Sequence, residues 1–301
     1  MSRAQGSGEA IPDALIAPLR ESTDAIGRPG ALSQRVTEDG YVFLRGVIPA
    51  ADVAAARLEV LRRLAEMGEV AAPIEDARWS GTSLRAERAG DLGAYWQSVC
   101  EGPALRRVAH GPALAAAAGA VLEASPLAQD FLYLRAAVPG TFTDLHCDYP
   151  FFARASERIV TCWVPLGPVP IEQGPLVIVE GSHRFDDLVA DARAVDVVTA
   201  PEKRAALSQG IAAFAQSRGA RLLTTDFLPG DVLIFGMTTF HASLDNHTPE
   251  PLIRLSFDLR IQAADAPRDD RFFGPSPVGI TGKGYAELNG AKPLGQSWHQ
   301  R

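Results

Sequence analysis

The 301-residue chain contains only three cysteines, and Cys100, Cys147 and Cys162 are not spaced as metal ligands usually are. An odd, low number of cysteines argues against a disulfide framework and favours a reducing compartment. The first residues include no apolar stretch of a signal peptide, and no apolar run is long enough to span a membrane. We therefore expect a cytoplasmic protein without a membrane segment.

Long runs of one charge are also missing, although the formal net charge is -7. A nucleic-acid groove needs a basic patch, so we expect a small-molecule substrate and no nucleic-acid partner. Apolar residues make up 47% of the chain, which is enough for a sizeable core in a monomer or a homodimer.

The first part of the chain is predicted to be helical after a disordered start. Residues 1–12 are small and polar, which is typical of disorder, and residues 13–301 are expected to form a single domain. A helix is predicted from Asp52 to a stop at Gly68, and a second helical region over 96–123. Residues 71–95 are rich in Gly, Pro, Arg and Asp and are predicted to form a loop.

From about residue 130 the pattern changes to short apolar runs separated by Gly and Pro. The runs are DFLYLRAAV, RIVTCWVPLG, GPLVIVEGSH, DVLIFGM and LIRLSFDLRIQ. Such runs predict a mainly β fold: a jelly-roll core over about 130–262, packed by the N-terminal helices. Residues 184–220 are expected to form a partly helical insert, and residues 263–301 to wrap the surface or cover a cavity mouth.

The chemistry-bearing motif is the triplet His146-Cys147-Asp148, followed far downstream by His241. Side chains two apart on a strand share a face, so His146 and Asp148 can reach one ion while Cys147 points away. Two histidines and one carboxylate are the ligand set of mononuclear non-haem Fe(II) oxygenases, and they leave positions open for a 2-oxoacid and O2. A single His-x-Asp is common by chance, and a buried histidine more often only satisfies a hydrogen bond.

A second group of candidates could bind the organic ligands. Arg254 and Ser256 share a face of the run RLSFDLR, and a guanidinium matches a carboxylate with two hydrogen bonds; the alternative is a surface arginine on an edge strand. Arg135 could pair with an anionic group of the substrate or form a structural ion pair. Four further side chains could line the cavity, although such residues are more often core: Trp79, Tyr133, Phe151 and Met237.

Four segments, in this order, resemble the phytanoyl-CoA dioxygenase family of Fe(II)/2-oxoglutarate-dependent oxygenases: HCDYPFF, TCWVPLGPVPIEQGPLVIVEGSHR, GDVLIFGMTTFHASLDN and RLSFDLR. They fall within residues 130–262. The resemblance implies a double-stranded β-helix core with His146, Asp148 and His241 as iron ligands. It also implies that Arg254 binds the C5 carboxylate of 2-oxoglutarate.

The resemblance further implies cosubstrate contacts from Ser243 and Phe152. The loop before Arg254 is longer than the resemblance leads us to expect, which makes Arg260 a weaker rival for the carboxylate. His247 lies in that loop, and its turn-like surroundings predict that it faces solvent rather than a metal.

The implied reaction is hydroxylation of an unactivated C–H bond in a small metabolite or natural-product intermediate, with succinate and CO2 as coproducts. Asp148 argues against a halogenase, which has a small residue there, whereas desaturation, epoxidation and ring formation use the same ligands. No basic cluster suggests a site for coenzyme A. The alternatives are a non-catalytic jelly-roll binding protein, an iron dioxygenase independent of 2-oxoglutarate, and a zinc hydrolase, which would need a different ligand set.

Overall fold

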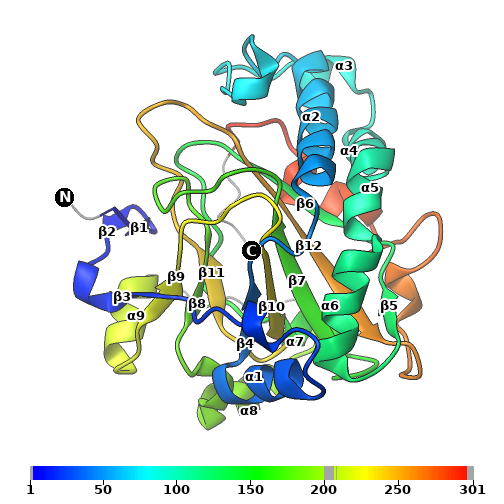
Figure 1. The fold of residues 1–301 in the computed structure, drawn as a ribbon. Coiled ribbons are helices and arrows are strands. Elements are labelled where there is room, and N and C mark those ends of the chain that lie inside the picture. The colour runs from blue at the N-terminus through cyan, green and yellow to red at the C-terminus, as the bar shows by residue number, and fades with distance from the viewer. Residues whose placement is uncertain (1–2, 200–206, 208, 297–301) are drawn as a thin grey trace.

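The computed structural model describes residues 3–199, 207 and 209–296. Two sheets of mainly antiparallel strands lie face to face (Figure 1). The larger sheet has the order β4 (Tyr41–Leu44), β10 (Val232–Gly236), β7 (Ile159–Pro165), β12 (Arg254–Ala263) and β5 (Pro126–Ala128), and β6 (Tyr133–Ala137) also pairs with β12. The smaller sheet has the order β11 (His241–Ser243), β8 (Leu176–Val179), β9 (Leu222–Thr224) and β3 (Ile16–Pro18).

Helices cover the outer side of each sheet. Four of them pack with the larger sheet in one apolar cluster: α2 (Ala50–Glu66), α4 (Leu92–Cys100), α5 (Pro103–Ala109) and α6 (Pro112–Leu122). Figure 1 shows α8 (Asp186–Arg193) and α9 (Ile211–Ser217) near the smaller sheet, where they contribute to a separate cluster. Among the described residues, no helix is both long and apolar enough to cross a membrane.

The observed secondary structure differs in part from the secondary structure predicted from the sequence. More of the described residues lie in helices than in strands, so the fold is mixed α and β rather than mainly β. The segment predicted as a loop over 71–95 contains α3 (Arg85–Arg88) and the start of α4. The remaining short helices are α1 (Ala31–Asp39), before β4, and α7 (Tyr149–Phe152).

The N-terminal segment is ordered where the sequence predicted disorder. Strands β1 (Gln5–Gly6) and β2 (Glu9–Ala10) form a hairpin, and Ile11 is fully buried. The backbone N–H groups of Ser7 and Gly8 donate to the Asp245 carboxylate at 2.9 and 2.7 Å. A partner so distant in sequence is invisible in local composition; residues 1–2 lie outside the described residues.

Strand β12 connects the fold to the site because its side chains alternate between two kinds of surroundings. Leu255, Phe257, Leu259 and Ile261 pack into the helical cluster. The other side chains, Arg254, Ser256, Asp258 and Arg260, belong to the opposite face, as the period of two requires, and they are also buried. A buried polar face is costly unless its groups have partners, so this face marks the region where function is expected.

Candidate metal centre and adjoining cavities

Three side chains from two segments meet at one end of the space between the sheets. His146 and Asp148 lie just before and at the start of α7, and His241 opens β11. His146 and His241 exchange two backbone hydrogen bonds of 3.0 and 2.8 Å, which fixes the two segments side by side. One ligand atom from each of the three residues lies within 4.8 Å of the other two. The structure therefore brings together the three residues that the sequence predicted as metal ligands.

Both imidazoles are oriented so that one nitrogen faces the cluster. His146 Nδ1 lies 2.7 Å from the Asp144 carbonyl, and His241 Nδ1 lies 3.0 Å from the Thr239 carbonyl. Each Nδ1–H donates to that carbonyl, so each Nε2 is left with the lone pair that binds a metal. Burial lowers the pKa of His241, and burial together with the neighbouring His241 lowers the pKa of His146 to about 3, which keeps both rings neutral.

The two oxygens of the Asp148 carboxylate have different neighbours: one accepts hydrogen bonds, and the other faces the two histidines. Oδ2 accepts hydrogen bonds from the Thr161 hydroxyl and, at 2.8 Å, from Arg260 Nη2. Oδ1 lies 3.7 Å from His146 Nε2 and 4.0 Å from His241 Nε2. Two atoms bound to one ion at about 2.1 Å lie no more than about 4.2 Å apart, so Oδ1 and the imidazoles fit a single transition-metal ion.

The charge of Asp148 is maintained by its surroundings. Burial would raise the pKa of its carboxyl group, but Arg260 and the two histidines hold that pKa well below its usual value. The Arg260 guanidinium itself is fixed between two rings, with its central carbon 4.0 Å from the Phe152 centroid and 4.5 Å from that of Tyr133. Arg260 and Thr161 thus orient the carboxylate for binding through one oxygen.

Replacing Thr161 by valine is expected to weaken metal binding about 10- to 100-fold, which is the usual effect of losing a partner of a metal ligand. Valine keeps the shape but removes the hydroxyl that donates to Asp148. Calorimetric titration of the apo protein with Co(II) measures the effect. Cys162→Ala is the matched control, because this neighbour is buried on the helical side of β7; equal affinities for T161V and wild type would show that the hydroxyl does not orient the ligand.

A small cavity of about 270 Å³ leads from the two histidines to Arg254. Arg254 is 2% exposed, and its Nη1 donates to Ser256 Oγ at 2.9 Å. Among the described residues, Arg254 Nε has no hydrogen-bond partner and no carboxylate lies within ion-pair distance of the guanidinium. Burial, and after it the charge of Arg135, lowers the pKa of Arg254 to about 10. A buried cation in this state is suited to an acidic ligand.

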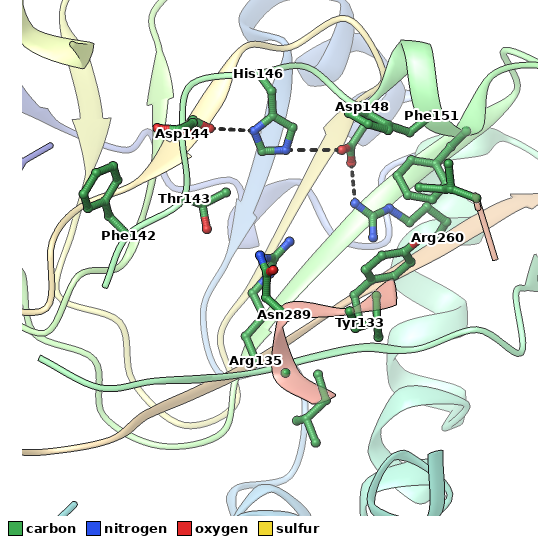
Figure 2. Close-up of a pocket in the computed structure, with 15 residues that line it drawn as sticks. Tyr133, Arg135, Phe142, Thr143, Asp144, His146, Asp148, Phe151, Arg260 and Asn289 are labelled. Atoms are coloured by element: carbon green, nitrogen blue, oxygen red, sulfur yellow. Dashed lines mark hydrogen bonds and ion pairs between the residues drawn. The ribbon is translucent and has the colours of Figure 1, made fainter. Parts of the chain in front are cut away.

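A larger cavity opens on the other side of the cluster (Figure 2). It holds about 800 Å³ of space, the open solvent at its mouth included. His146 and Asp148 form one part of its wall, and Arg135 and Asn289 form another. Residues from the C-terminal segment, among them Ile280 and Leu288, complete the lining. Residues 280–290 of the predicted C-terminal segment therefore supply part of a cavity wall, in line with one of the two sequence-based alternatives, while residues 297–301 lie outside the described residues.

The predicted cavity residues have different outcomes. Tyr133 and Phe151 line the larger cavity, and so does Phe152, which was expected beside the cosubstrate. Trp79 does not line either cavity; it packs against the core, and its backbone N–H donates to the Pro251 carbonyl. Met237 is a buried core residue, also away from both cavities.

The remaining predictions concern polar residues. Ser243 lines the smaller cavity, and its Oγ accepts a 2.7 Å hydrogen bond from the Thr143 N–H. Arg135 forms the structural ion pair of one alternative, with Asp258 at 2.6 Å. It also lines the two cavities, so its pairing with an anionic group of the substrate stays a prediction. His247 is half-buried rather than fully exposed, and it is not part of the metal cluster.

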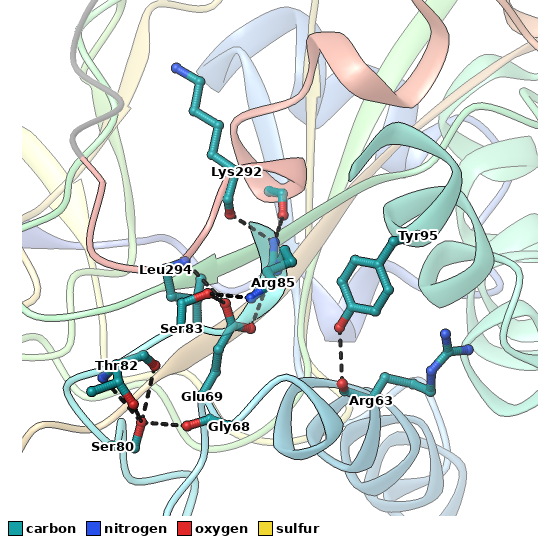
Figure 3. A network of polar contacts seen from close by, with 11 residues as sticks. Arg63, Gly68, Glu69, Ser80, Thr82, Ser83, Arg85, Tyr95, Lys292 and Leu294 are labelled. Carbon is teal, nitrogen blue, oxygen red and sulfur yellow. Dashed lines mark hydrogen bonds and ion pairs between the residues drawn. The ribbon is translucent and has the colours of Figure 1, made fainter. Parts of the chain in front are cut away.

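The C-terminal wall of the larger cavity is fastened by a buried ion pair (Figure 3). Arg85 Nη2 lies 2.6 Å from Glu69 Oε2, and both side chains are fully buried. Arg85 also donates to the carbonyls of Gly290 and Lys292, while Glu69 accepts from the Leu294 N–H at 3.1 Å. This network could not be predicted from the sequence, because Glu69 and Arg85 look like ordinary surface charges and their partners in the C-terminal segment are more than 200 residues away.

Comparison with known families and proteins agrees with this site. The family model described as phytanoyl-CoA dioxygenase (PhyH) matches residues 36–254. The chain is 28% identical over 262 residues to the 1-deoxypentalenic acid 11-beta-hydroxylase of Streptomyces arenae, an alignment that covers 82% of this chain and 86% of the relative.

Solved structures with the same arrangement include two enzymes from nogalamycin biosynthesis. The epimerase SnoN, in complex with Fe3+, alpha ketoglutarate and nogalamycin RO, is 25% identical with a TM-score of 0.51, covering 88% of this chain and 94% of SnoN. The alpha ketoglutarate dependent carbocyclase SnoK is 19% identical with a TM-score of 0.56, covering 92% and 97% of the two chains, and supports the fold only.

Proposed function

Because the chain belongs to the phytanoyl-CoA dioxygenase family and is a non-haem Fe(II)/2-oxoglutarate oxygenase, we propose that it hydroxylates an unactivated C–H bond of a small natural-product intermediate. Iron is held by His146, Asp148 and His241. We also propose that the two sheets form a double-stranded β-helix, as the family membership implies. Succinate and CO2 are the coproducts of this reaction.

The observation that carries the proposal is the continuity of the three-ligand cluster with the pocket of Arg254. The three ligands leave part of the coordination sphere for other groups, and bound iron supplies the activation of O2 that C–H oxidation requires. Arg254 binds the C5 carboxylate of 2-oxoglutarate with its unpaired Nε and its guanidinium edge, and Ser256 holds this arginine in place.

The other residues of the chain position the reactants and exclude water. Ser243, at the wall of the smaller cavity, contacts the cosubstrate. The larger cavity receives the substrate beside His146 and Asp148, with Tyr133, Phe151 and Phe152 as part of its aromatic wall. The substrate in the name of the 28% identical relative supports a natural-product intermediate over an acyl-coenzyme A. Among the described residues, the cations that line the cavity are Arg135 and Arg260, and each is already paired with a carboxylate rather than grouped for the coenzyme phosphates.

Conversion of 2-oxoglutarate to succinate tests the proposal. We expect the protein to form succinate slowly in the presence of Fe(II) and O2 and faster once a substrate is added, and Asp148→Ala to reduce the rate by at least about 100-fold through loss of the metal ligand. Absence of succinate from the Fe(II)-loaded protein across a broad substrate library would favour a binding protein or an oxygenase independent of 2-oxoglutarate.

Epimerisation is a second candidate, because the 25% identical SnoN is an alpha ketoglutarate dependent epimerase. The two outcomes differ in the mass of the product. Hydroxylation adds one oxygen atom, whereas epimerisation leaves the mass unchanged and inverts a stereocentre. Mass spectrometry and NMR of the product therefore decide between them, and they also detect desaturation, epoxidation or ring formation.

A further inference from the structure

Arg135 lies where the two cavities meet, and only part of its guanidinium is occupied. Its Nε donates to Asp258 Oδ2 at 2.6 Å. Within the part of the chain that the structure describes, neither Nη atom makes a hydrogen bond, and the side chain remains 20% exposed. The Nη edge is therefore available to a ligand, whereas the Nε side is fixed by an ion pair that holds the guanidinium in a defined direction.

The available edge selects for one type of chemical group. Two N–H donors in a plane match the two oxygens of a carboxylate, and an arginine in a fixed orientation loses little entropy when it binds one. Asp258 already balances most of the Arg135 charge, so a singly charged carboxylate suits this place better than a group of phosphates.

The remaining wall of the larger cavity complements a hydrocarbon body. Phe151, Ile280 and Leu288 contribute apolar surface, and Asn289 borders the cavity beside Arg135 (Figure 2). The turn that carries Asn289 packs on β6, the strand of Arg135. The Arg135 side of the cavity faces His146 and Asp148, so a molecule held there directs its body towards the metal centre.

We propose that the substrate is an apolar molecule with one carboxylate group, which Arg135 binds through its two Nη atoms while the hydrocarbon body lies against the metal centre. This inference rests on the proposed function, because it assigns the larger cavity to the substrate. The wall beside Arg135 is held in place by the Glu69–Arg85 pair, through the carbonyls of Gly290 and Lys292. Recognition therefore takes place on a fixed surface, and Arg135 determines specificity.

Binding to the protein loaded with Ni(II) and 2-oxoglutarate tests the inference without turnover. The probes are three acids, cyclohexanecarboxylate, adamantane-1-carboxylate and naphthalene-1-carboxylate, each compared with its primary amide by calorimetry. At least one acid is expected to bind tenfold or more tightly than its amide. Arg135→Lys keeps a cation beside Asp258 but lacks the two coplanar N–H donors of the guanidinium. It should remove most of the preference for the acid over its amide and leave the Kd of 2-oxoglutarate within threefold of the wild-type value.

Arg193→Lys provides the control, since Arg193 is exposed in an ion pair with Glu157. The inference is overturned if no acid binds better than its amide, if Arg135→Lys weakens acid and amide equally, or if it weakens 2-oxoglutarate instead. Failure of 2-oxoglutarate to bind the wild type would contradict the proposed function separately, and the acid–amide comparison with Ni(II) alone would then decide the inference.

Discussion

Replacing Arg254 by methionine is expected to raise the Kd of 2-oxoglutarate by at least about 30-fold, equivalent to about 2 kcal/mol or more, and to leave metal binding unchanged. The guanidinium is buried and lacks a carboxylate partner among the described residues, so the donors that Ser256 does not use, Nε among them, are available to the ligand. The metal ligands are contacted by Thr161, Arg260 and backbone carbonyls rather than by Arg254.

The same substitution should not lower the stability of the ligand-free protein, although it weakens ligand binding. A buried cation without a counter-charge costs desolvation free energy, and methionine removes that cost while it fills much of the same volume. The free energy of unfolding of R254M, measured with urea in the absence of ligands, is therefore expected to equal or exceed that of the wild type. A large loss of stability would mean that Arg254 has a structural partner.

A pair of arginine-to-lysine variants separates Arg254 from its rival Arg260. Arg254→Lys keeps the charge but loses the fork, so we expect at least a tenfold rise in the Kd of 2-oxoglutarate. Arg260→Lys should leave that Kd within threefold, because Arg260 binds Asp148 and lies between the rings of Tyr133 and Phe152. Calorimetry on the Ni(II)-loaded variants measures both values, and the reverse order would assign the carboxylate to Arg260.

Glu69→Gln is expected to lower the free energy of unfolding by about 3–5 kcal/mol, the cost of leaving one partner of a buried ion pair without its counter-charge. Arg85 would remain in a site with no exposure, packed against the rings of Tyr95 and Trp96. Its only described carboxylate partner is Glu69. The fastening of the cavity wall would weaken at the same time, since Glu69 also accepts from Leu294.

Urea unfolding followed by tryptophan fluorescence measures this loss. The matched control is Glu66→Gln in the exposed pair with Arg63, for which we expect a change within about 1 kcal/mol. A similar small change for both variants would show that the Glu69–Arg85 pair does not fasten the C-terminal segment. Substrate affinity of the folded E69Q protein should fall more than its affinity for 2-oxoglutarate, because the wall borders only the larger cavity.

The metal ligands were predictable because a short motif and a distant histidine carried a chemical pattern. The His-x-Asp spacing and the ordered segments around it pointed to His146, Asp148, His241 and Arg254. The strand assumed for the first two was wrong, because Asp148 has helical backbone angles at the N-cap of α7 and the turn of the chain there brings its carboxylate to the histidines. The partners of the ligands were not predictable. Arg260 was considered only as a rival for a carboxylate of the cosubstrate, since its contact with Asp148 joins residues 112 positions apart.

Strand β12 illustrates a second limit. Its alternation of apolar and polar residues is typical of a strand with one face in water, but both faces are buried. The polar face points into the space between the sheets, where Arg254 and Asp258 line the smaller cavity. The polar residues of this strand therefore indicated a binding site and not contact with solvent. Such a case is resolved only when the second sheet is known to cover that face.

Aromatic residues and chain ends were the least predictable. Phe152 packs on Arg260 and lines the larger cavity, so its expected contact with the cosubstrate stays a prediction. Trp79 and Met237 pack in the core and line neither cavity. Side-chain type does not distinguish a cavity wall from a core. The N-terminal hairpin is held by Asp245, a contact that local composition cannot reveal.

The most direct test is anaerobic addition of Fe(II) and then 2-oxoglutarate to the apo protein, followed by visible spectroscopy. We expect a weak charge-transfer band of the chelated 2-oxoacid, which is absent in Asp148→Ala and needs a much higher 2-oxoglutarate concentration in Arg254→Met. Tight binding of Fe(II) without any such band at saturating 2-oxoglutarate would contradict the assignment of the cosubstrate pocket.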